Sequence, residues 1–130
     1  FAEPDIISIH VRLNSSTRGL ITASDLAAMR SDSLFVNTSR AELVEPNQLL
    51  AALNAGRPGG AAVDVFENEP LTNRDDPLVN HPNLLCTPHI GYVTEDEYEL
   101  QFSDIFDQVN AFARGAPINV INTEALGLLT

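Results

Sequence analysis

Short apolar runs alternate along this chain with segments in which apolar side chains recur at helical spacing. Four runs rich in β-branched or other apolar residues have the length of buried strands. They occupy residues 6–11, 34–36, 61–65 and 84–86. Because each run is too apolar to leave a sheet face in water, the pattern predicts a sheet that is buried on both sides.

The segments between the first three runs have the start and stop signals of short helices. Thr22 and Asp25 have the spacing of a capping box, and Leu26 and Met29 follow at helical spacing. The second segment has Pro46 at an expected first helical position and a stop at residues 56–58. Its apolar stripe consists of Leu49, Leu50 and Leu53. We therefore expect one short helix in each segment.

A longer helix is predicted after the fourth run. It opens at Thr94 with an acidic first turn, which suits the positive end of a helix dipole, and it ends at Gly115 and Pro117. One side carries the apolar residues Tyr98, Phe102, Ile105, Phe106, Val109 and Phe112. We interpret this side as a face that packs into the core, with a partner-binding surface as the alternative.

Strands that alternate with helices indicate an α/β fold. We predict a parallel sheet with helices on both faces, which corresponds to the C-terminal half of a doubly wound, Rossmann-like sheet. The longest irregular segment, residues 67–83, is rich in Pro, Asn and Asp. Loops of this length are usually functional.

Composition narrows the class of protein. The chain has 130 residues, 44% of them hydrophobic, which is enough for one domain. Its net charge of −11 disfavours nucleic acid and anionic membranes as partners. No run is long enough to span a membrane, so a soluble, cytoplasmic protein is expected. Cys86 is expected to be a small buried side chain.

The chemistry-bearing side chains follow the predicted strands. Arg40 follows the second, Asp64 and Glu69 lie at and after the third, and His89 follows the fourth. Ligands bind beyond the carboxyl ends of parallel strands, so these groups are expected at one edge. His89 is the natural acid/base, Glu69 would hold its tautomer, and Arg40 would anchor a carboxylate or ketone oxygen. Taken singly, they could also be a loop histidine, a solvated acid and a surface cation.

Three ordered runs, residues 36–40, 60–70 and 87–91, closely resemble motifs of the D-isomer-specific 2-hydroxyacid dehydrogenase family, the group to which phosphoglycerate dehydrogenases belong. The resemblance implies NAD- or NADP-dependent interconversion of a 2-hydroxy acid and a 2-keto acid. It assigns substrate binding to Arg40, support of the imidazole to Glu69 and proton exchange to His89. Glu69 stands where the formate dehydrogenase branch has an amide, which favours a hydroxyacid enzyme.

The same resemblance implies a set of residues that contact the cofactor. They are Val11, Thr38, Ser39, Arg40, Asp64, His89, Ile90, Gly91 and Tyr92. Asp64 would meet the nicotinamide end, with a strand-end cap as the alternative role. Two residues depart from the family pattern, Arg12 where proline is usual and Tyr92 where a small residue is common. No metal site is expected.

The sequence lacks the Gly-rich phosphate loop and the following acidic residue of a dinucleotide site. It also begins without methionine, directly before an apolar run, so we interpret the chain as a fragment. Residues 1–116 would be a partial cofactor domain, and 117–130 would lead back toward an absent substrate domain. A homodimer is expected at full length. A nucleotide-sensing regulatory protein and a non-catalytic structural piece are the alternatives to an enzyme.

Overall fold

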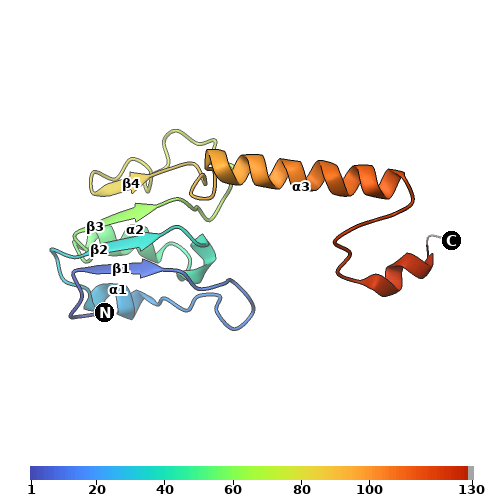
Figure 1. Cartoon of the computed structure of the whole chain (residues 1–130). Helices are drawn as coiled ribbons and strands as arrows, with labels where there is room; N and C mark the ends of the chain where they lie inside the picture. The colour runs from blue at the N-terminus through green and yellow to red at the C-terminus, as the bar shows by residue number, and fades with distance from the viewer. Residues whose placement is uncertain (129–130) are drawn as a thin grey trace. The chain divides into compact units, whose positions relative to one another are not determined.

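The computed structural model describes residues 1–128, which form two compact units, Phe1–Gly91 and a second unit that begins at Tyr92. The elements in chain order are the strand β1 (Ile6–Ile9), the helix α1 (Ala23–Ala28), β2 (Leu34–Asn37), the 3₁₀ helix η1 (Ala41–Leu43), α2 (Gln48–Asn54), β3 (Gly60–Val63), β4 (Leu84–Cys86), α3 (Glu95–Ala113) and the 3₁₀ helix η2 (Thr123–Leu128) (Figure 1). The predicted division into a cofactor domain at residues 1–116 and a return segment at residues 117–130 stays a prediction. The last two residues of the return segment lie outside the described residues.

The first unit contains a parallel sheet in the order β1-β2-β3-β4, which confirms the predicted α/β class. Two strands end earlier than the apolar runs indicate, β1 at Ile9 and β3 at Val63. The reason is that both pair with Asn37, the last residue of β2, and no ladder partner continues beyond it. Asp64 and Val65 therefore follow β3, although both are buried.

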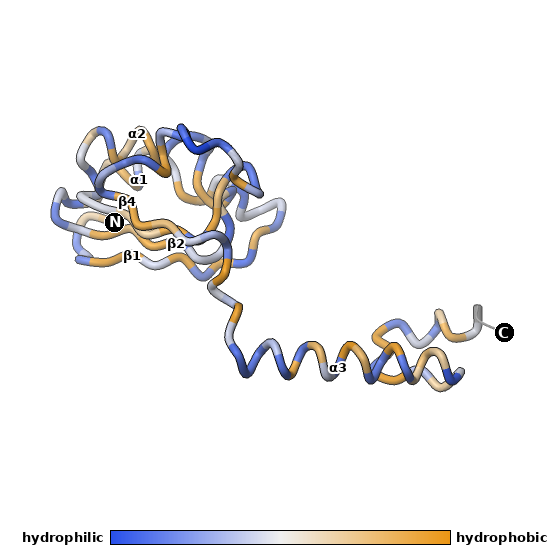
Figure 2. The backbone as a smooth tube through the Cα atoms, turned by 90° about the horizontal axis from the view of Figure 1, so that it is seen from above, coloured by the Kyte–Doolittle hydropathy of each residue, from blue (hydrophilic) through white to orange (hydrophobic). Residues whose placement is uncertain are grey.

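Both helices of this unit lie on the same face of the sheet (Figure 2), so the prediction of helices on both faces is wrong for this unit. Parallel crossovers are almost always right-handed, and strands added in one direction place successive helices on one face. The opposite face is partly open, because Ile6 and Leu85 are 61% and 69% exposed. A switch of strand order, which would bring helices to that face, does not occur within these four strands.

The core lies between the sheet and these two helices. Phe35 from β2 and Leu26 from α1 are completely buried there, together with Met29 just after α1. The capping box that fixes the start of α1 is confirmed, since the Thr22 hydroxyl accepts the N–H of Asp25 while the Asp25 carboxylate accepts the N–H of Thr22. The helix thus begins where its apolar side chains meet the sheet.

The start of α2 differs from the prediction. Pro46 lies before the helix, and Asn47 precedes the first helical residue in a left-handed conformation with φ 61°. The Asn47 N–H donates to a carboxylate oxygen of Glu67 (2.7 Å), so a long-range contact decides where the helix starts. Its end agrees with the prediction, because Gly56 has φ 73°, a conformation that glycine adopts without steric cost.

The helix α3 of the second unit begins after Thr94, whose hydroxyl accepts the N–H of Glu97 (3.2 Å). Its predicted apolar face is not buried, and the six residues of that face are 41% to 61% exposed. Aromatic rings lie next to one another along it at i, i+4 spacing, and the tilted Tyr98–Phe102 pair has a centroid distance of 4.3 Å. Sequence period reveals an apolar face but not what covers it, so the prediction of core packing is wrong within residues 1–128. No helix in this range is long and apolar enough to cross a membrane.

Candidate active site

The carboxyl ends of the parallel strands bring the predicted site residues to one edge of the first unit. Ser39 follows β2, and its hydroxyl donates to the carbonyl of Val11 after β1 (2.8 Å). Asp64 follows β3, and Thr87 follows β4. The hydroxyl of Thr87 donates to the Asp64 carboxylate, so the last two strand ends are also tied together. The edge is thus cross-linked by side chains at both of its ends.

Asn37 organises the turn that carries Arg40. Its side chain is buried, donates from Nδ2 to the carbonyl of Arg40 (2.9 Å) and accepts the N–H of Ser39 at Oδ1 (3.0 Å). Sequence reasoning assigned no role to this residue. The available signal was a polar side chain at a core-facing position of a strand, because buried polar groups require hydrogen-bond partners.

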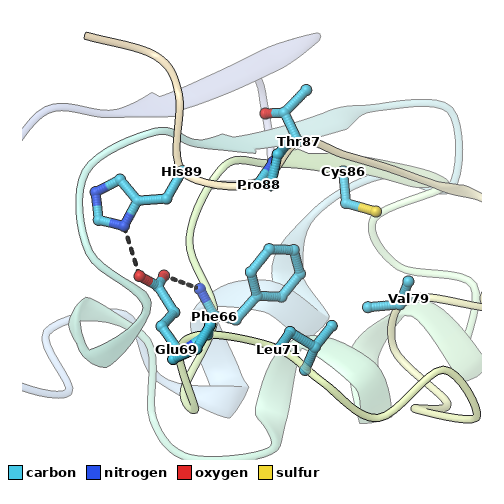
Figure 3. Close-up of a pocket in the computed structure, with 9 residues that line it drawn as sticks. Phe66, Glu69, Leu71, Val79, Cys86, Thr87, Pro88 and His89 are labelled. Atoms are coloured by element: carbon cyan, nitrogen blue, oxygen red, sulfur yellow. Dashed lines mark hydrogen bonds and ion pairs between the residues drawn. The ribbon is translucent and has the colours of Figure 1, made fainter. Parts of the chain in front are cut away.

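His89 and Glu69 form a close pair (Figure 3), as the sequence predicts. The distance from His89 Nδ1 to Glu69 Oε2 is 2.6 Å, and both side chains are about one-third exposed. The other carboxylate oxygen of Glu69 accepts the N–H of Phe66 (2.8 Å). One acid therefore connects the imidazole to the backbone after β3.

The carboxylate of Glu69 is ionised at neutral pH. Burial alone would raise its pKa, but the hydrogen bonds from His89 and the Phe66 N–H and the positive charge of Arg40 outweigh burial and lower the pKa. An ionised carboxylate only accepts hydrogen bonds, so Nδ1 of His89 must carry the shared proton. In this tautomer Nε2 is the unprotonated nitrogen of the ring, the atom that can accept a proton.

Arg40 is exposed at the same edge. Its Nη1 donates to the carbonyl of Ser39 (2.6 Å), and its charge contributes to the lowered pKa of Glu69. None of the ion pairs found among residues 1–128 involves Arg40. The guanidinium is thus a permanently charged donor next to the imidazole pair, as an anchor for a carboxylate requires.

Asp64 is only 3% exposed and accepts three donors, which include the N–H of Ile90 (2.9 Å) and the N–H of Gly91 (2.7 Å). Burial alone would raise its pKa, but the Thr87 hydroxyl, the two N–H groups and the nearby charge of His89 together lower it. The alternative interpretation of Asp64 as a strand-end cap therefore has direct support, while a cofactor contact stays a prediction.

The lowered pKa of Asp64 predicts a loss of stability in acid. The folded-state pKa is below the ordinary value of 3.8, so this stabilisation is complete above that value and is lost as the pH falls toward the folded-state pKa. Asp64→Asn should lower the free energy of unfolding at about pH 7 and reduce its decline below about pH 4. Urea unfolding across this range measures both effects. An unchanged acid profile would show that Asp64 does not contribute, and Thr87→Val should reproduce part of the effect.

A cavity of about 580 Å³ lies beside the imidazole pair (Figure 3). Apolar side chains from the loop after β3, among them Phe66, Leu71 and Val79, surround it. Cys86 also lines it and is only partly buried, which corrects the expectation of a small buried side chain. The long loop is thus structured around this space, in line with the functional reading of its length.

The remaining predicted cofactor residues are exposed. Val11 and Thr38 lie at the strand ends, while Ile90 is 48% exposed and uses its backbone N–H for Asp64. Tyr92 is 58% exposed and begins the second unit, and Arg12 is exposed as well. Within residues 1–128, no group of three or more His, Cys, Asp or Glu side chains forms a metal site.

Comparison with known proteins gives consistent matches. The model of the NAD-binding domain of D-isomer-specific 2-hydroxyacid dehydrogenases matches residues 1–91. Glyoxylate/hydroxypyruvate reductase B of Salmonella newport is 36% identical over 126 residues, which are 96% of this chain and 39% of the relative. The chain thus spans about two-fifths of the length of its curated relatives.

Solved structures agree. An oxidoreductase of Ralstonia solanacearum superposes with a TM-score of 0.91 at 48% identity, over 97% of this chain and 37% of the other. Phosphoglycerate oxidoreductase of Vibrio cholerae superposes with a TM-score of 0.83 at 52% identity, over 89% of this chain and 37% of the other. The NAD complex of a D-isomer-specific 2-hydroxyacid dehydrogenase of Lactobacillus delbrueckii superposes with a TM-score of 0.76 at 28% identity, over 92% of this chain and 40% of the other.

Proposed function

Because the chain belongs to the D-isomer-specific 2-hydroxyacid dehydrogenase family, we propose that it supplies the catalytic side chains of an NAD- or NADP-dependent oxidoreductase that interconverts a D-2-hydroxy acid and a 2-keto acid. The observation that carries the proposal is the 2.6 Å pair of His89 and Glu69 at the same strand edge as Arg40. An acid/base, its carboxylate partner and a cation are the groups that this reaction requires.

The residues present fit one half of a dinucleotide. Thr38 and Ser39 lie beyond β2, Asp64 lies beyond β3, and the turn of residues 89–91 lies beyond β4, which is where open parallel sheets bind cofactors. A phosphate-binding Gly-rich loop is not part of this sequence. When bound, a nicotinamide supplies or accepts the hydride, and the side chains of this chain orient the substrate and move the proton.

His89 exchanges the proton in this proposal. In the oxidative direction, neutral Nε2 accepts the hydroxyl proton of the substrate while Nδ1 stays bonded to Glu69. In the reductive direction, protonated His89 donates from Nε2 to the oxygen of the keto group. The ionised Glu69 stabilises the imidazolium in both directions, because opposite charges attract strongly where solvent access is limited. Arg40 holds the carboxylate of the substrate in both directions.

The names of the relatives indicate which substrates to test first. An assay would follow NADH and NADPH oxidation by a polypeptide that joins this chain to its upstream sequence, with glyoxylate, hydroxypyruvate and pyruvate as acceptors. Clear turnover with one of them is expected. Tight cofactor binding without turnover would support a nucleotide-sensing protein instead, and neither binding nor turnover would support a structural piece. Gel filtration of the same protein tests the predicted homodimer.

The role of Arg40 predicts the effect of Arg40→Lys. The substitution keeps the charge but loses the planar fork, which makes two parallel hydrogen bonds to a carboxylate. We expect the Michaelis constant for the keto acid to rise about tenfold or more, with a smaller fall in kcat. Steady-state kinetics measure both constants. Arg18→Lys is the matched control, because Arg18 is a surface residue paired only loosely with Glu42 (3.9 Å). Equal kinetics for the wild type and Arg40→Lys would make Arg40 structural.

A further inference from the structure

Arg12 lies beyond the carboxyl end of β1, at the same edge of the sheet as the candidate active site. The last register pair of β1 and β2 is Ile9 with Asn37. Arg12 and Arg40 each follow this pair by three positions, so the two arginines occupy equivalent places at neighbouring strand ends. The proposed function gives a role to Arg40 but none to the guanidinium of Arg12.

Hydrogen bonds fix the backbone on both sides of the Arg12 side chain. The carbonyl of Val11 accepts the hydroxyl of Ser39 after β2 (2.8 Å). The carbonyl of Arg12 itself accepts the hydroxyl of Thr17 (2.8 Å). The Thr17 hydroxyl oxygen also accepts the N–H of Asn14 (2.8 Å), which closes a small loop after Arg12. The side chain therefore starts from a backbone that is held at the edge beside the end of β2.

The guanidinium of Arg12 has no partner within residues 1–128. The residue is exposed, and no ion pair or side-chain hydrogen bond of this part of the chain involves its guanidinium. The sequence has 18 acidic residues against seven basic ones, so acidic partners are plentiful. Arg12 thus presents a permanently charged, planar fork, and this geometry is matched to a phosphate group.

Charge is distributed unevenly along the strand edge. Residues 6–24, which contain β1 and the segment after it, include two of the seven arginines and no Asp or Glu. Residues 33–41, which contain β2, also lack an acid. In contrast, Asp64, Glu67 and Glu69 follow β3. An elongated ligand with an anionic part is therefore attracted by that part to the β1–β2 end of the edge and repelled from the β3 end.

We propose that Arg12 binds a phosphate group of the dinucleotide. This inference rests on the proposed function, in which the nicotinamide lies beside His89 at the end of β4. Neighbouring strands lie about 4.8 Å apart, so three spacings separate the ends of β4 and β1 by roughly 14 Å. A dinucleotide with its nicotinamide at His89 therefore extends along the edge towards β1.

The strand order supports this location. In doubly wound sheets the dinucleotide crosses the crevice at the point where the strand order reverses. This chain corresponds to the second half of such a sheet, so the order β1-β2-β3-β4 puts the crevice beside β1, where Arg12 lies. Arg12 stands where the family pattern has proline, which has neither a charge nor an N–H group. The contact is thus an addition to those that the resemblance implies.

The test compares dinucleotide binding by the wild type and by Arg12→Gln, in the complete polypeptide that contains this chain. Glutamine removes the charge, so the dissociation constant should rise about tenfold and depend less on salt. Fluorescence titrations with NADH and NADPH measure both. Equal losses for the two would assign the pyrophosphate to Arg12, and a loss confined to NADPH would assign the phosphate on the adenosine ribose. Unchanged dissociation constants for both would overturn the proposal.

Arg74→Gln is the matched control, because it makes the same change in net charge at an exposed arginine of the loop before β4. It should leave both dissociation constants unchanged, and an equal loss in Arg74→Gln would overturn the proposal in favour of a general effect of charge. Arg12→Lys should recover part of the affinity, since an ammonium keeps the charge and loses the fork. The midpoint of thermal unfolding should be the same for Arg12→Gln and the wild type.

The same titrations separate this inference from the proposed function. A wild type that binds a dinucleotide but turns over no acceptor would defeat the proposed oxidoreductase, and the Arg12→Gln titration would still decide the role of Arg12. Turnover by the wild type with unchanged affinity in Arg12→Gln would overturn this inference alone. A wild type that binds neither NADH nor NADPH would overturn both.

Discussion

Replacement of His89 by alanine is expected to lower the kcat of the complete enzyme by about 10²- to 10⁴-fold, the usual contribution of a positioned acid/base. The affinity for the cofactor should change little, because the imidazole acts on the substrate oxygen. Nε2 is the reactive atom in this argument, since Nδ1 is bonded to Glu69 at 2.6 Å. Steady-state kinetics, together with a fluorescence titration with NADH, separate the two effects.

His81→Ala is the matched control for this experiment. His81 lies in the turn before β4, where its Nδ1 accepts the N–H of Asn83 (3.2 Å). Its loss should leave kcat unchanged. If His89→Ala also retained the wild-type kcat, the histidine would have no part in the mechanism, and the proton would have to be exchanged by another group.

The second large effect is expected for the 130-residue chain produced alone, which should show no measurable dehydrogenase activity and little affinity for NADH although it carries Arg40, Glu69 and His89. A dinucleotide normally anchors its pyrophosphate on the N–H groups and the dipole of a helix that follows a Gly-rich loop, and this sequence has no such loop. Loss of this anchor removes the main contribution to cofactor affinity.

The structure gives a second reason to expect an inactive chain, which is the low stability of the chain on its own. Strand β1 pairs only with β2 within the described residues, and Ile6 on it is 61% exposed. An open edge of this kind is a template for association. We therefore expect the isolated chain to be marginally stable or to self-associate, which size-exclusion chromatography and thermal unfolding would show.

A titration of the purified chain with NADH and an activity assay with several 2-keto acids test this prediction. The control is the longer polypeptide that includes the upstream sequence, in which binding and turnover should appear. Micromolar binding or clear turnover by the short chain would refute the account of the cofactor anchor. If neither polypeptide binds NADH or reduces a 2-keto acid, the result would instead point to a non-catalytic role.

Much of the active-site arrangement could be predicted because parallel strands end at one edge. Arg40, Glu69 and His89 are far apart in the sequence, yet each follows a different strand, so the fold class alone brings them together. The pairing of His89 with Glu69 follows from this rule and is confirmed at 2.6 Å. Their catalytic roles stay proposals, because proximity shows what the groups can do and not that they do it.

Other features depended on contacts that no local pattern contains. Asn37 and Asp64 hold the site turns through bonds to backbone groups, and backbone donors are the same whatever the sequence around them. The left-handed backbone conformation of His89 could not be predicted either, because the usual sequence signal for a positive φ is a glycine and this position has a histidine. The start of α2 differs from the prediction for the same reason, because the N–H of Asn47 donates to Glu67, which is twenty positions away in the sequence.

By itself, the sequence determined the strands, the capping of α1 and the strand edge at which chemistry is concentrated, because apolar period and capping act over a few neighbouring residues. Only the tertiary structure decided which faces are covered. Both helices of the first unit lie on one side of the sheet, and the apolar face of α3 is exposed within the described residues. Burial depends on what approaches a surface from elsewhere in the fold, and this information is not present in the period of a single element.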